Sequence, residues 1–130
     1  MEDHPIAGLK VKDAVSKGVK LVVANPFDSH ADEWATAKLS IEDNMDFLKQ
    51  VAKGLFDAGC DPKNADGVEE LKNSLKDIEV GEDAKKLVEY YTKSKKAMIV
   101  FDQNNISSDA ARMIANIAVI SGHIGKARSG

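Results

Sequence analysis

Two runs of β-branched and apolar residues constrain the fold of this chain most strongly. One run covers residues 19–24 and the other covers residues 97–101, and neither shows the polar alternation of a half-exposed strand. Such runs are typical of parallel strands, which helices cover on both faces. Residues 38–41, Lys-Leu-Ser-Ile, are interpreted as a further, brief strand. The sequence therefore predicts a parallel sheet.

Segments with apolar residues at helical spacing separate these runs. They cover residues 9–17, 29–37, 45–58, 68–75, 82–94 and 108–121. Candidate helix caps are Ser40 or Asp43, Asp66, and Ser107 or Ser108. Alternating helices and strands imply right-handed helical crossovers between parallel strands. We expect an α/β fold, a three-layer Rossmann-like partial parallel sheet with helices on both faces.

The predicted sheet is small for this class. It has two clear strands and one short one, whereas most sheets have about 4–6 strands. The length of 130 residues suits one domain, so residues 1–130 are interpreted as a single α/β domain. The small sheet predicts that this domain is truncated and belongs to a larger chain.

Charge and composition limit the partners. The net charge is −3, and the densest basic run, Lys93, Lys95 and Lys96, lies at the end of a predicted helix, where cations complement the helix dipole. Binding to nucleic acid requires clustered basic residues, so no nucleic-acid partner is expected. No apolar stretch reaches the roughly 20 residues that span a bilayer, so no direct membrane insertion is expected.

Cys60 is the only cysteine, which excludes an internal disulfide and a cysteine-based cluster within this chain. A reducing, cytoplasmic setting is the expectation. His4, His30 and His123 lack metal-ligand spacing, and motifs such as GxGxxG, GxxxxGK[ST], GxSxG and HExxH do not occur. No catalytic residue and no metal site is predicted.

Two polar loops are the candidate binding site. One follows the first predicted strand at residues 25–30, and the other follows the last at residues 102–105. Ligands of open α/β sheets bind beyond the carboxyl ends of the strands, where a parallel sheet would place these loops side by side. The alternative is that their Asn, Asp and Ser side chains only cap helices and form turns.

Three segments resemble a known family. Residues 115–130, ANIAVISGHIGKARSG, resemble the pattern A-x-L-x-x-L-T-G-N-I-G-[RK]-x-G-[ST]-G of molybdopterin oxidoreductases. Residues 2–6, EDHPI, resemble its E-x-H-P-[VI], and residues 18–26, GVKLVVANP, resemble its G-A-K-[LV]-I-V-x-D-P. The resemblance is to the molybdopterin oxidoreductase large subunits of formate dehydrogenase (alpha) and of NADH-quinone oxidoreductase. It covers essentially the entire chain, with residues 60–96 matching only in layout.

The resemblance implies an internal Rossmann-like domain that holds the guanosine end of a molybdopterin guanine dinucleotide. The iron–sulfur clusters and the molybdenum ligand would lie in the parent chain, outside this fragment. Implied partners are the remaining domains of the parent and other subunits of an electron-transfer complex. The implied cofactor-binding residues are Asn25, Pro26, Phe27, Asn44, Asp102, Gln103 and Asn104.

The chain departs from the family at each of these loops. Asn25, Pro26 and Phe27 replace D-P-R, so the carboxylate that would take a ribose hydroxyl is lost. Residues 41–44 replace P-G-T-D without its glycine, and residues 102–107 replace a glycine-rich G-x-x-Q loop. These departures predict weak or absent binding of the dinucleotide.

Three functional hypotheses follow. The first is a dinucleotide-binding domain of an active molybdenum enzyme, such as a formate dehydrogenase. The second is a vestigial scaffold domain without cofactor in an electron-transfer complex of the NADH dehydrogenase kind. The third is a stand-alone α/β interaction module. Under the first two the parent is an oxidoreductase, and this chain alone is inactive because it lacks the metal centre.

Overall fold

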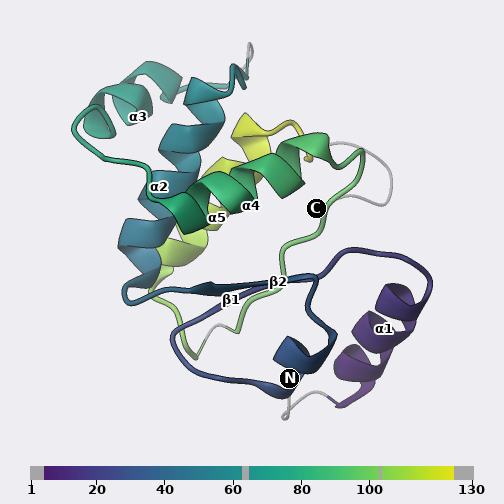
Figure 1. Cartoon of the computed structure of the whole chain (residues 1–130). Helices are drawn as coiled ribbons and strands as arrows, with labels where there is room; N and C mark the ends of the chain where they lie inside the picture. The colour runs from purple at the N-terminus through teal and green to yellow at the C-terminus, as the bar shows by residue number, and fades with distance from the viewer. Residues whose placement is uncertain (1–4, 63–64, 103, 125–130) are drawn as a thin grey trace. The chain divides into compact units, whose positions relative to one another are not determined.

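The computed structural model describes residues 5–62, 65–102 and 104–124, and the chain divides into two compact units, Met1–Glu42 and Asp43–Gly130 (Figure 1). The first unit contains α1 (Pro5–Ser16), β1 (Val22–Asn25), the 3-10 helix η1 (His30–Trp34) and β2 (Ala37–Ser40). The second contains α2 (Asn44–Asp57), α3 (Val68–Ser74), α4 (Glu82–Lys93) and α5 (Ser108–Ile120). The described residues thus form a small α/β fold with more helix than strand.

The strands of the first unit are parallel, as the sequence predicts. The register pairs Val22 with Ala37 and Asn25 with Ser40. A backbone hydrogen bond of 2.7 Å from Thr36 N to Leu21 O starts the pairing. Both strands therefore end at the same edge, where the loop after β1 begins.

The first strand begins three residues later than predicted, because Val19 is still hydrogen-bonded to the C-terminal end of α1. Gly18 has φ +92°, a left-handed conformation that glycine adopts without strain. Val19 N then donates to Ala14 O at 3.1 Å, which continues the helix ending. The predicted helix at residues 29–37 is also shorter, since it is the 3-10 helix η1 followed directly by β2.

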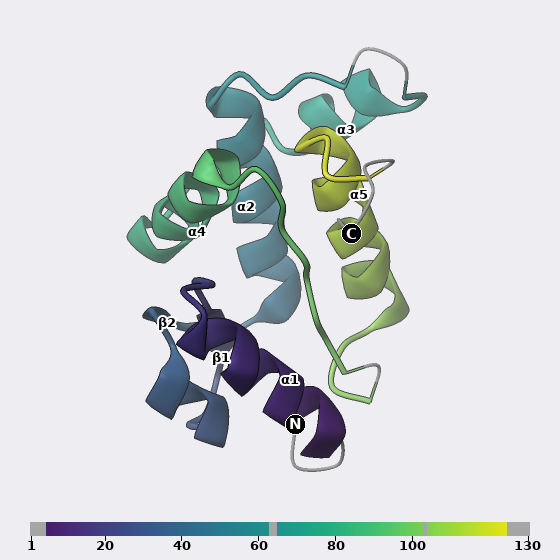
Figure 2. The same ribbon diagram turned by 90° about the vertical axis from the view of Figure 1, so that its right-hand side faces the viewer.

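The second unit is a helical cluster in which α2 packs against both α4 and α5 (Figure 2). The periodicity of the sequence predicts these helices correctly, because α4 and α5 each present an apolar stripe to α2. The most deeply buried side chains of the unit are Val51, Ala52, Leu55, Leu75, Ala84, Ala110 and Ile117. This core holds α2, which begins at the candidate residue Asn44, and α5, whose N-cap Ser107 follows the second candidate loop.

A buried histidine joins the end of α5 to α4. The ring of His123, only 4% exposed, lies 4.5 Å from the ring of Tyr91 between centroids. Its Nε2 lies 3.4 Å from the carbonyl oxygen of Tyr91. Burial raises the pKa of the Tyr91 hydroxyl, and a hydrogen bond with Ser121 partly offsets this increase. The contact between His123 and Tyr91 therefore joins the C-terminal end of α5 to α4.

Two of the predicted caps are confirmed and one is wrong. The side chain of Asp43 accepts a hydrogen bond from Asp46 N, and that of Ser107 accepts one from Ala110 N. Asp66 does not cap α3, because Gly67 precedes this helix with φ 78° and makes no side-chain cap bond.

Residues 97–101 are not a strand, so the strand predicted there from the sequence is wrong, whereas the short strand predicted at residues 38–41 exists as β2. They form an extended segment after α4 (Figures 1 and 2), and in the described part of the chain residues 98–101 make no backbone hydrogen bond. Strand propensity reflects packing against neighbouring strands, which this segment lacks. Met98 and Val100 are consequently 74% and 64% exposed.

The close crossing of α2 and α4 depends on Gly54. A Cβ atom at this position would lie 2.9 Å from Cγ2 of Val88 and 3.4 Å from Cγ1 of Val80. We expect Gly54→Ala to lower the free energy of unfolding by about 1–2 kcal/mol, because overpacking outweighs the better helix propensity of alanine. Urea unfolding followed by circular dichroism measures this loss.

The matched control for Gly54→Ala is the same substitution in a Val88→Ala background, which removes the nearest methyl group, Cγ2 of Val88. There the alanine is expected to cost much less stability, since the crowding is relieved. An equal cost in both backgrounds would show that the helix crossing does not explain the glycine.

Candidate functional site

The loop after β1 stands at the carboxyl edge of the parallel pair, as predicted. Asn25 is the last residue of β1, and Pro26 and Phe27 follow it on the surface. The side chain of Phe27 is 61% exposed, so it is not part of the core. Of these three residues predicted to bind the cofactor, only Asn25 joins the polar contacts of the loop.

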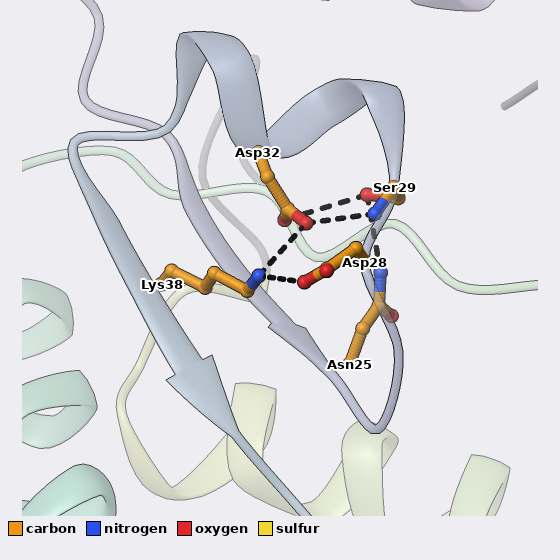
Figure 3. A network of polar contacts seen from close by, with 5 residues as sticks. All are labelled: Asn25, Asp28, Ser29, Asp32 and Lys38. Atoms are coloured by element: carbon orange, nitrogen blue, oxygen red, sulfur yellow. Dashed lines mark hydrogen bonds and ion pairs between the residues drawn. The ribbon is translucent and has the colours of Figure 1, made fainter.

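Five residues of the loop, of η1 and of β2 form a polar network beside this edge of the sheet (Figure 3). Lys38 of β2 forms an ion pair with Asp28, and its Nζ lies 3.3 Å from Oδ2 of Asp32. The backbone N–H of Ser29 donates to Oδ2 of Asp32 at 2.7 Å. The side-chain amide of Asn25 donates to Oγ of Ser29 at 3.4 Å. Each polar side chain of the network is therefore engaged by another.

The network also shifts the acidity of its members. The pKa of the Asp32 carboxyl is lowered, chiefly by the hydrogen bond from Ser29 N–H, with further contributions from the hydrogen bond and charge of Lys38 that desolvation opposes. The pKa of the Lys38 ammonium is raised, chiefly by its hydrogen bond with Asp28. The charged forms of both groups are thus the stabilised ones.

The lowered pKa of Asp32 predicts a loss of stability in acid. A carboxyl whose pKa is lower in the folded state stabilises the fold above its unfolded pKa, about 4, and this contribution disappears as pH falls through the folded value. We expect Asp32→Asn to lose less stability than the wild type between about pH 6 and pH 2. Urea unfolding followed by Trp34 fluorescence at each pH measures this. Identical acid profiles would contradict a role for this carboxylate.

The second candidate loop is organised around Asp102. Its Oδ1 accepts a hydrogen bond from Asn104 N at 2.9 Å, and its Oδ2 accepts one from the Asn105 amide at 2.7 Å. The side-chain amide of Asn44 donates to Asn105 O at 3.3 Å. The structure therefore brings Asn44 to the loop that holds Asp102 and Asn104. Gln103, also predicted to bind the cofactor, lies outside the described residues.

The two loops belong to different compact units. The sequence-based expectation that they lie side by side therefore stays a prediction. Sequence reasoning missed Asp32 and Lys38, the centre of the first network. Two signals could have indicated them: the spacing of Asp28 and Asp32, four residues apart, and a lysine at the start of the brief strand predicted at residues 38–41.

The residues present do not fit the dinucleotide that the family resemblance implies. In the first loop two carboxylates face one ammonium group, a balance that repels a pyrophosphate, and both carboxylates already pair with Lys38. A helix N-terminus can bind a phosphate, but the anionic side chain of Asp43 already occupies that place on α2. The loops have the chemistry of turns and caps rather than of a phosphate cradle.

Metal-binding and thiol chemistry find little support in the described residues. Among them, no group of three or more His, Cys, Asp or Glu side chains is arranged to hold a metal ion. The Cys60 thiol is partly buried, and desolvation raises its pKa, which disfavours the reactive thiolate. No helix within the described ranges has the length and apolar character needed to cross a membrane.

Comparison with known proteins adds no assignment, because no protein-family model and no curated protein matches this chain.

Proposed function

We propose that this chain is an internal domain of the large subunit of an electron-transfer oxidoreductase of the NADH-quinone oxidoreductase type. In this role it is a scaffold that holds no pterin nucleotide. The three resembling segments and the parallel strands with a polar loop at their carboxyl edge support the placement in such a parent. The proposed partners are the other domains of the parent and the neighbouring subunits of its complex.

The observation that carries the scaffold role is the polar network around Lys38. A ligand site keeps donors and acceptors available for its ligand, whereas Lys38 pairs with both Asp28 and Asp32, and Asp32 also accepts hydrogen bonds from the N–H and the hydroxyl of Ser29. Binding a nucleotide here would break an ion pair and bring phosphate toward carboxylates. The network instead ties η1 to β2, which is a structural task.

The proposal includes the finer fold expected from the sequence. A three-layer Rossmann-like sheet needs more strands than β1 and β2. The other parts of the parent would supply them. The chemistry of the parent would then be carried by iron–sulfur clusters in its other domains, in a cytoplasmic setting.

Analysis of the purified full-length parent tests this assignment. We expect iron and acid-labile sulfide without molybdenum, and no oxidoreductase turnover by the 130-residue chain alone. Stoichiometric molybdenum would contradict the scaffold role and favour an active molybdenum enzyme such as a formate dehydrogenase. A parent without iron–sulfur clusters would contradict the electron-transfer assignment, and a native coding sequence that ends near Gly130 would favour the stand-alone interaction module.

A further inference from the structure

The segment from Lys96 to Asp102 has an unusual combination of exposure and charge. Between these two charged residues lie five apolar residues, of which Met98, Val100 and Phe101 are 74%, 64% and 46% exposed. Exposure alternates along the first part of the segment, because Ala97 and Ile99 are only partly exposed. The segment thus presents an apolar face with the side-chain period of a β-strand.

The backbone of residues 98–101, in the middle of this segment, is available for pairing. In the described part of the chain, residues 98–101 make no backbone hydrogen bond, although they form an extended segment (Figure 2). An extended run with unpaired N–H and C=O groups is a template for a further strand. The apolar side chains would gain the cross-strand contacts that they lack in one chain.

The order of the two charged residues, Lys96 before Asp102, favours a second copy of this chain as the partner and an antiparallel direction of pairing. From the geometry we infer that two copies of this chain pair antiparallel through residues 96–102, centred on Ile99. Lys96 of one copy then faces Asp102 of the other, and the same pair forms again at the opposite end. A parallel pairing in register would instead place Lys96 against Lys96 and Asp102 against Asp102. Among the described residues Lys96 has no ion-pair partner of its own.

The apolar residues agree with this register. Met98 faces Val100, and Ala97 faces Phe101, so a small side chain meets a large one. Ile99 faces Ile99 on the two-fold axis, which gives the self-complementary interface of a symmetric dimer. The pairing is short compared with standard interfaces, so we expect a dimer only at high protein concentration. This inference does not depend on the proposed function.

Charge reversal followed by sedimentation equilibrium tests the pairing. Lys96→Asp and Asp102→Lys are each expected to weaken dimerisation by about tenfold, because two attractive pairs become repulsive. The double variant restores the attraction with the signs exchanged, so its dimerisation should return to within about threefold of the wild type. The control is Lys95→Asp, which makes the same charge change one residue away, on the other face of the strand.

Asp102 also accepts hydrogen bonds from Asn104 and Asn105 within its own loop, so Asp102→Lys could weaken the dimer by disturbing that loop. The double variant separates the two causes, because it restores the charge pair but not these hydrogen bonds. A second measurement uses disulfide trapping in a Cys60→Ser background. Ile99→Cys places two thiols opposite each other at about 4.5–5.5 Å between Cα atoms, within reach of a disulfide. Ala97→Cys is the control, since it faces Phe101 and should cross-link poorly.

A wild-type chain that stays monomeric at every concentration would overturn the inference. So would a dimer that the single reversals do not weaken or the double variant does not restore. Equal cross-linking of the variants at residues 97 and 99 would exclude this register and overturn it as well.

Discussion

Replacing Leu55 with alanine is expected to lower the free energy of unfolding of the helical unit by about 3–4 kcal/mol. Leu55 lies on α2, between the helices that pack on it, and has no exposed surface. Alanine removes buried methyl and methylene groups and leaves a cavity, because α4 and α5 hold α2 from two directions. Urea unfolding followed by the helical signal in circular dichroism measures the change, since most helix belongs to this unit.

The matched control for Leu55→Ala is Leu9→Ala in α1, where the leucine side chain is 67% exposed. The same atoms are removed there without emptying a core, so we expect a change within about 0.5 kcal/mol. Similar losses for the two variants would contradict the packing described for the second unit.

Leu39→Ala is the second large effect that we expect, a loss of about 2–4 kcal/mol that falls on the first unit. Leu39 is the only buried residue of β2 and has no exposed surface. Trp34, the only tryptophan of the chain, lies in η1 of the same unit, with the Lys38 network tying η1 to β2. Its fluorescence therefore reports the unfolding of this unit.

Thr36→Ala is a suitable control for Leu39→Ala, because Thr36 is exposed and precedes the same strand. It removes the hydrogen bond from Leu21 N to the Thr36 hydroxyl, a contact that water can replace, and should cost about 1 kcal/mol or less. A fluorescence midpoint that Leu39→Ala leaves unchanged would contradict the described core of the first unit.

The helices could be predicted from the sequence, because the features that determine them lie close together along the chain. In α2, α4 and α5, apolar residues recur at helical spacing, and Asp43 and Ser107 supply cap residues at the first turns. These features act within a few residues of each other. The cap of α3 was predicted wrongly, because Gly67 supplies its start through backbone conformation rather than through a side chain.

Local sequence pattern could not show whether residues 97–101 form a strand. Their composition is that of a strand, but a strand exists only where another chain segment accepts its hydrogen bonds. The similar run at β1 does find such a partner, since Val23 pairs with Lys38. Strand pairing depends on residues that are distant in the sequence, so of these two similar runs one forms a strand and the other does not.

The candidate site was predicted in part for the same reason. The sequence indicated the positions of the loops, because polar residues follow the ends of apolar runs. It did not indicate that Lys38 engages both Asp28 and Asp32, which requires β2 to lie beside β1. The contact of Asn44 with Asn105 likewise joins two helix starts that are far apart in the sequence.

Nuclear magnetic resonance tests most directly whether the polar loops serve only the fold, as we propose, or bind a nucleotide. The isotope-labelled chain would be titrated with guanosine monophosphate and guanosine diphosphate while the side-chain amides of Asn25, Asn44 and Asn104 are followed. These amide signals are expected to stay in place throughout both titrations. Saturable shifts of these signals would contradict the scaffold account and show that the loops bind a nucleotide.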